Sequence, residues 1–161
     1  MTLARDFEDF VKLLNKHKAA YMVVGGYALA FHGKPRHTGD LDIWIDISNS
    51  NAAKMLRVVK DFGLGSLGFT KKDFLKEGFV SQIGHPPLRI DILNSIDGVE
   101  FEKAYKNKLS IDLDNICIDY IGLGDFIKNK QSTGRARDLA DITDIQNVSQ
   151  AIVKKGKSFK R

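Results

Sequence analysis

Residues 40–47 constrain the fold more than any other segment, because apolar and polar side chains alternate without interruption through DLDIWIDI. A period of two is typical of a strand with one buried face, since successive side chains point to opposite sides of a sheet. The two faces would consist of Leu41, Ile43, Ile45 and Ile47 on one side, and of Asp40, Asp42, Trp44 and Asp46 on the other. The chain therefore needs a sheet with a covered aliphatic face and a second face that carries carboxylates.

Hydrophobic periodicity elsewhere predicts both helices and strands. Helices are expected over 4–17, 27–32, 51–62, 71–77, 100–107, 123–130 and 136–148. Further strands are expected over 20–24, 79–83, 88–93 and 115–121. This mixture predicts an α/β (α+β) fold, with a mixed β-sheet and helices mainly on one face. Cys117 lies between two isoleucines and is expected in the core.

The length of 161 residues fits one domain, which we place over residues 1–150. Residues 151–161 contain four lysines and one arginine and no acid. The rest of the chain then holds 25 − 5 = 20 bases against 20 acids, so the net charge of +5 resides in this tail. We expect a flexible basic tail, which gives only weak support to nucleic-acid binding.

Composition also bears on the compartment. The single cysteine excludes an intrachain disulfide, and no apolar stretch approaches the ~20 residues that a membrane helix needs. The acidic, amphipathic start of the sequence does not resemble a signal peptide. We therefore expect a cytoplasmic protein without a membrane partner.

Asp40 and Asp42 are candidate metal ligands. Two residues apart on a strand, their side chains leave the same face, with Cβ atoms roughly 6–7 Å apart. Carboxylates at that spacing repel each other unless a cation lies between them, and Mg²⁺ prefers such oxygen ligands. Asp91, within another apolar strand, could bring a third carboxylate to the same ions. The alternatives are a solvated strand face for the pair and an ion pair for Asp91.

Gly25 and Gly26 separate a buried strand from a helix. Glycines in that position let the backbone approach a phosphate closely, although a simple tight turn is an equal alternative. Arg36 precedes the aspartate strand and could neutralise phosphate charge, as could Lys130 and Arg135 near the last helix break. The alternative for these bases is a solvated basic face, or pairing with the acids that follow them in the last helix, Asp138 and Asp141.

These residues together resemble a known family. Order and spacing are similar to those of the DNA polymerase beta-type nucleotidyltransferase superfamily and, more narrowly, to small bacterial nucleotidyltransferase-like proteins, some of which belong to toxin–antitoxin systems. The resemblance spans about residues 20–145. It rests on Val24-Gly25-Gly26-Tyr27-Ala28, on Arg36-His37-Thr38-Gly39-Asp40-Leu41-Asp42, on Leu88-Arg89-Ile90-Asp91-Ile92-Leu93, and on the segment from Lys130 through Gly134-Arg135 to Ile142.

The resemblance implies a nucleotidyltransferase fold and a set of roles. Asp40, Asp42 and Asp91 would be the catalytic residues that bind Mg²⁺ or Mn²⁺, with the third also activating the acceptor. By the same resemblance, Gly25 and Gly26 would hold the nucleotide phosphates. Together with Thr38 and the bases considered above, the expected nucleotide-binding residues are Gly25, Gly26, Arg36, Thr38, Lys130 and Arg135. Tyr27 stands where many active members carry a serine that contacts a phosphate.

The sequence thus predicts a metal-dependent enzyme that moves a nucleoside monophosphate from a nucleoside triphosphate to a hydroxyl acceptor on a protein, an RNA or a small molecule. The alternative is a catalytically weak nucleotide-binding module, such as an antitoxin or regulator, that acts through a protein partner (a toxin or a substrate protein). A third hypothesis, RNA binding through the basic tail, is the weakest.

Overall fold

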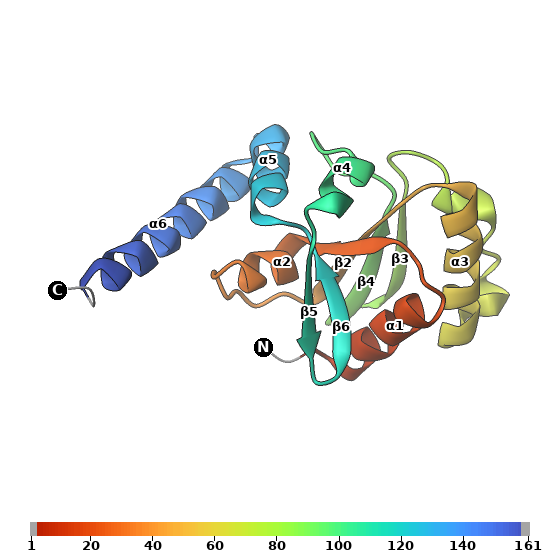
Figure 1. The fold of residues 1–161 in the computed structure, drawn as a ribbon. Helices are drawn as coiled ribbons and strands as arrows, with labels where there is room; N and C mark the ends of the chain where they lie inside the picture. The colour runs from red at the N-terminus through yellow and green to blue at the C-terminus, as the bar shows by residue number, and fades with distance from the viewer. Residues whose placement is uncertain (1–2, 159–161) are drawn as a thin grey trace.

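The computed structural model describes residues 3–158, within which six strands form one mixed sheet in the order β3-β4-β2-β1-β6-β5 (Figure 1). The central strand β2 is antiparallel to β1 and parallel to β4, while β1 is parallel to β6. The predicted mixed sheet and α+β class are confirmed. The strands are β1 (Tyr21–Val24), β2 (Asp40–Ile45), β3 (Val80–His85), β4 (Leu88–Leu93), β5 (Leu109–Leu113) and β6 (Ile116–Tyr120).

Three helices cover the aliphatic face of the sheet: α1 (Arg5–Lys16), α2 (Gly25–Phe31) and α3 (Asn49–Val59). The ring of Phe7 in α1 packs edge-on against Tyr27 in α2, with 5.7 Å between centroids. On the sheet side, the hydroxyl of Tyr21 in β1 donates to Asn15 in α1. Leu41, Ile43 and Ile45 are fully buried, as the alternation of β2 predicts.

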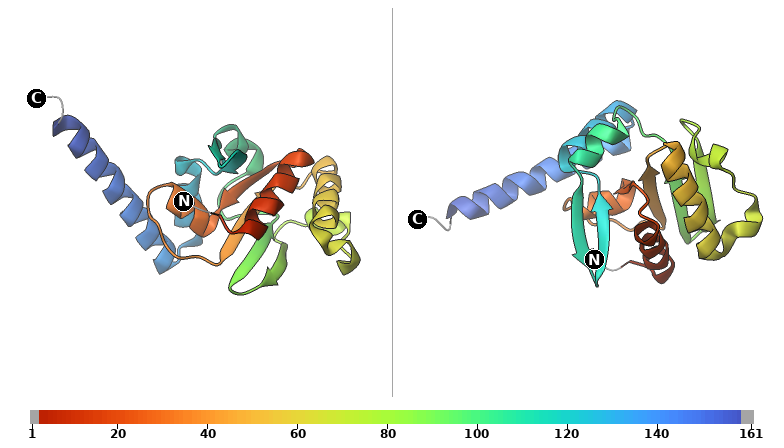
Figure 2. Two further views of the ribbon diagram at one scale, coloured as in Figure 1. Left: turned by 90° about the horizontal axis from the view of Figure 1, so that it is seen from below. Right: turned by 45° about the vertical axis from the view of Figure 1, so that its right-hand side comes forward.

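The opposite face of the sheet carries the acidic side chains of β2 and is partly covered by α4 (Phe101–Lys106). Trp44 packs edge-on against Phe101, with 5.0 Å between ring centroids, so its indole is buried beside the carboxylates. Next along the chain come α5 (Leu123–Thr133) and the long helix α6 (Ala136–Ser158), which leaves the body and projects away from it in every view (Figures 1 and 2).

Most element boundaries agree with the sequence predictions, and side chains cap two of the helical segments. Ser48 accepts a hydrogen bond from the Asn51 amide at the start of α3. Thr70 and Asp73 form a reciprocal cap on the short helical turn Lys71–Phe74. Further helical turns cover Lys60–Leu64 and Gly65–Leu67.

The edge strand β5 was not expected from the sequence. Its residues do alternate, with Leu109, Ile111 and Leu113 on one face and Ser110 and Asp112 on the other. The turn Asp114-Asn115 follows, with φ angles of 50° and 66° that suit a tight hairpin. The pattern of a strand was therefore present in the sequence and was overlooked. The expectation of a buried Cys117 is wrong, because Ile116 and Ile118 take the covered face of β6 and the thiol points to solvent.

Helix α6 is longer than predicted and continues from residue 148 to Ser158. It therefore continues past residue 150, the expected end of the domain, into the basic tail, and residues 159–161 of that tail lie outside the described residues. Ile152 and Val153 are exposed on this helix. Within residues 3–158, no helix combines the length and the apolar character that a bilayer crossing requires.

Candidate functional site

Asp40, Asp42 and Asp91 come together on the open face of the sheet. In the parallel pairing of β2 with β4, Asp42 lies directly opposite Asp91, and Asp40 lies opposite Arg89. Residues paired in this way point to the same face, so two strands separated by more than forty residues of sequence contribute to one cluster. The cluster lies next to β1, where Val24 pairs with Asp42.

The Arg89 guanidinium lies between two of these carboxylates. Its Nε and Nη2 donate to the two oxygens of Asp91 at 2.7 and 2.9 Å, and Nη2 also donates to Oδ2 of Asp40 at 3.3 Å. Such a two-pronged arginine–carboxylate pair is among the stronger polar contacts in proteins. Arg89 was not among the predicted site residues, although its position two residues before Asp91 places both side chains on one face of β4.

Asp42 has no comparable partner, since no hydrogen-bond donor within residues 3–158 pairs with its carboxylate. Burial raises the pKa of Asp42 to about 7, and repulsion from Asp91 and Asp40 adds to this, while the charges of Lys130 and Arg89 act in the opposite direction. A buried carboxyl next to other negative charges is stabilised by a bound proton or a bound cation.

Both predicted glycines lie against the cluster. Gly25 has φ of +66°, and a Cβ built on it would overlap Oδ2 of Asp42. A Cβ on Gly26 would come within 3.0 Å of the Thr38 side chain. The glycine pair therefore lets the backbone pass close to two predicted site residues, and α2 begins at Gly25 itself, not at Tyr27 as expected.

A basic hollow of about 340 Å³ opens above these residues. It gathers every predicted site residue except Asp91, from four separate segments of the chain: Gly25, Gly26, Arg36, Thr38, Asp40, Asp42, Lys130 and Arg135, together with Arg137 and Asp138. A neighbouring hollow of about 270 Å³ shares Gly25, Asp42, Lys130 and Arg135 with it, and adds Leu93, Ser95 and Asn129.

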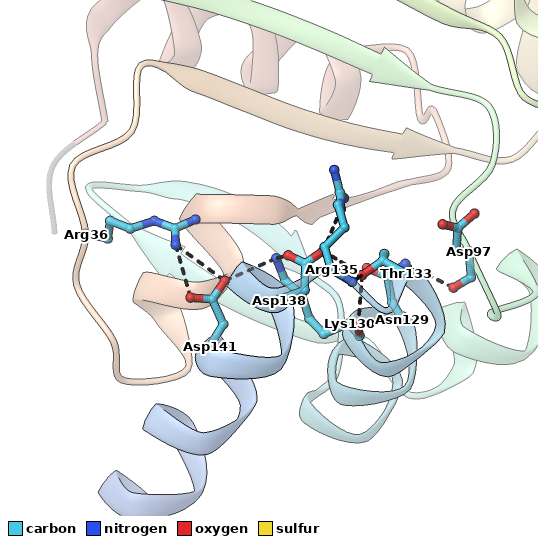
Figure 3. A network of polar contacts seen from close by, with 8 residues as sticks. All are labelled: Arg36, Asp97, Asn129, Lys130, Thr133, Arg135, Asp138 and Asp141. Carbon is cyan, nitrogen blue, oxygen red and sulfur yellow. Dashed lines mark hydrogen bonds and ion pairs between the residues drawn. The ribbon is translucent and has the colours of Figure 1, made fainter.

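Lys130 is buried where the two hollows meet, held by a polar network between α5 and α6 (Figure 3). Its Nζ donates to Asp138 at 2.9 Å and lies 3.5 Å from Asp141, which also accepts from Arg36 at 3.0 Å. Asp138 further accepts from Thr133 and Arg135, at 2.6 and 2.9 Å. Although burial raises the pKa of Asp138, these hydrogen bonds and charges lower it to about 2.

Tyr27 does not reach the cluster. Its ring packs against Phe7 on the helix-covered side of the sheet, and burial raises the pKa of its hydroxyl. The Tyr27 side chain does not line the basic hollow, so it is not placed to contact a ligand there.

The three carboxylates of the cluster differ in their hydrogen-bond partners and in their access to the basic hollow. Asp40 and Asp42 both line the basic hollow, and Asp42 has both oxygens unpaired by protein donors among the described residues. Asp91 instead gives both oxygens to Arg89. Within residues 3–158, no group of three or more His, Cys, Asp or Glu side chains has an arrangement suited to a metal ion.

Comparison with known proteins supports the architecture. No family profile and no curated protein sequence matches this chain. Among solved structures, a Thermotoga maritima protein, provisionally described as a nucleotidyltransferase, superposes with a TM-score of 0.54 and 15% identity. The superposition covers 98% of this chain and 92% of that one. The chain therefore has a nucleotidyltransferase-like fold.

Proposed function

We propose that this protein is a metal-dependent nucleotidyltransferase that moves a nucleoside monophosphate from a nucleoside triphosphate to a hydroxyl acceptor. One observation carries the proposal: separate segments of the chain place two glycines, the carboxylates of Asp40 and Asp42, and several bases around one hollow. In such a transfer, the acceptor oxygen bonds to the α-phosphorus while the bond to the β-phosphate oxygen breaks, and pyrophosphate leaves.

Each part of the hollow suits one requirement of a triphosphate. Gly25 and Gly26 leave space for phosphate oxygens to approach the backbone. Arg135 and Arg137 supply positive charge from the rim, and Arg135 is 75% exposed on its side chain although it also bonds Asp138. Lys130 adds a charge that is already fixed in place, which reduces the entropy lost when a ligand binds.

Asp40 and Asp42 would hold Mg²⁺ or Mn²⁺ in this proposal. When bound, the cation would offset the charge of the triphosphate and lower the pKa of the attacking hydroxyl. The raised pKa of Asp42 supports this assignment, because a carboxyl crowded by two like charges gains most from a cation. Asp91 is the third acid of the cluster, directly opposite Asp42.

Calorimetry of the four nucleoside triphosphates with Mg²⁺ tests the proposal, comparing the native protein with Asp42→Asn and with Asp112→Asn, an exposed control on β5. We expect micromolar binding by the native protein and by the control. Asp42→Asn should bind at least tenfold more weakly, a loss of about 1.4 kcal/mol.

Thermal unfolding at pH 8 shows whether that loss is a folding defect. The pKa of Asp42 is near 7 in the folded protein and near 3.8 as a free group, so its charged form opposes folding above pH 7. Asp42→Asn removes that charge and should therefore melt at a higher temperature while it binds nucleotide more weakly. Equal nucleotide affinity in the two proteins would refute the proposal, and tight binding without pyrophosphate release would favour the regulatory alternative.

A further inference from the structure

Arg89 is the charged side chain of the acidic cluster that the proposed transfer does not yet use. It extends from β4 across to β2, so its guanidinium contacts acids on both strands. Arg89 donates hydrogen bonds to two of the predicted metal ligands. Lys130 and Arg36 instead bond acids of α6.

The geometry divides the three acids into two kinds. Asp91 is 8% exposed, lines neither hollow, and accepts a hydrogen bond on each oxygen from Arg89. Asp40 and Asp42 face the basic hollow, and only Oδ2 of Asp40 has a contact with Arg89, at 3.3 Å. A cation that enters from the hollow therefore meets Asp40 and Asp42 first.

Charge balance also favours a single divalent cation bound by Asp40 and Asp42. The cluster carries three carboxylates, and the guanidinium of Arg89 offsets one of them permanently because arginine does not lose its proton in proteins. One divalent cation would balance the remaining two charges. A second divalent ion would have to displace a two-pronged hydrogen-bonded pair from a mostly buried carboxylate, and the guanidinium would repel it.

We propose that Arg89 takes the place of a second divalent cation, so that the chain holds one ion between Asp40 and Asp42. Asp91 then acts as a positioning residue, which anchors the guanidinium beside the ion. This inference rests on the proposed function, since it specifies how many ions that site binds and what fixes the remaining charge.

Titration of the protein with Mn²⁺ alone, followed by electron paramagnetic resonance of the free ion, tests the inference by counting bound ions. We expect one ion per chain for the native protein and for Arg57→Gln, an exposed control on α3. Arg89→Gln frees both oxygens of Asp91 and should bind two. Arg89→Lys, which keeps the charge, should bind one.

Variants of the acids distinguish a metal ligand from a residue that only positions the Arg89 guanidinium. Asp42→Asn should lose the single ion. Asp91→Asn should still bind one, up to about tenfold more weakly, because Arg89 then lacks the carboxylate that offsets its charge. Circular dichroism and melting temperatures of each variant show that the fold is retained.

Three results would overturn the inference: two ions, or none, on the native protein; one ion on Arg89→Gln; or loss of the ion in Asp91→Asn. Two ions on the native protein would leave the proposed transferase activity intact. Failure of that activity is detected separately, by absent nucleotide binding in the calorimetry described above.

Discussion

Gly25 and Asp42 depend on each other at the level of single residues. The carboxylate of Asp42 occupies the position that a side chain at residue 25 would fill, and the backbone of Gly25 has a positive φ that other residues adopt only at a cost. This contact places Asp42, whose pKa is raised by burial, next to the backbone of the glycine pair. A glycine is thus required here for two independent reasons, the space and the backbone angle.

Gly25→Ala should lose nucleotide binding by more than tenfold, because the new methyl group displaces the Asp42 carboxylate. Gly68→Ala is a matched control, since Gly68 has φ of +76° and nothing within 4 Å of an added Cβ. Both variants should lose about 1 kcal/mol of stability from backbone strain. Calorimetry would contradict the prediction if both variants bound nucleotide equally well.

At the level of elements, the junction of α5 with α6 decides where Lys130 lies. Its ammonium group is buried, and two acids from the first turns of α6 balance it. Arg36, from the segment before β2, bonds one of those acids, so the junction is tied to the strand that carries Asp40 and Asp42. Unpairing such a buried charge costs more than breaking an exposed ion pair.

Asp138→Asn should destabilise the protein by about 2 kcal/mol or more at pH 7. The pKa of Asp138 is lowered to about 2, so the stability that its charge contributes is complete above the unfolded pKa of 3.8 and is lost as the pH falls through 2. Urea unfolding at several pH values should therefore show a difference between native and variant proteins that shrinks below pH 4.

The exposed pair between Lys34 and Asp144, both about 40% accessible, provides the control for that experiment. Asp144→Asn should change stability by less than about 1 kcal/mol at every pH. A difference for Asp138→Asn that stays constant down to pH 2 would show that its charge does not stabilise the junction.

For the whole molecule, part of the excess positive charge lies away from the site. Lys154, Lys155 and Lys157 belong to the far part of α6, where residues 151–156 are exposed, while the described residues that line the hollow extend only to 138. Net charge alone therefore says little about the ligand of the hollow.

A chain that ends at residue 150 should keep its fold and bind nucleotide within about twofold of the native affinity, since none of the described residues that are removed lines the hollow. Any salt-sensitive RNA binding by the native protein should disappear with these residues. A chain that ends at residue 134 lacks Asp138 and Asp141 and should lose both stability and nucleotide binding. Weakened nucleotide binding by the longer fragment would contradict this division of roles.

The sequence by itself determined which residues share a face and where the chain turns. The period of two in β2 put Asp40 and Asp42 on one side, and the glycine pair, the N-caps and most element types followed from local chemistry. These features depend on neighbours within a few residues, which the sequence shows directly. The roles of the site residues stay predictions until binding is measured.

Only the tertiary structure decided which distant residues meet. Pairing of β2 with β4 put Asp42 opposite Asp91 and Arg89 within reach of Asp40, and docking of α6 buried Lys130 between two acids. Alternation fixes the face of a strand but not its neighbour or register, because any strand with a similar apolar face can satisfy the same backbone hydrogen bonds.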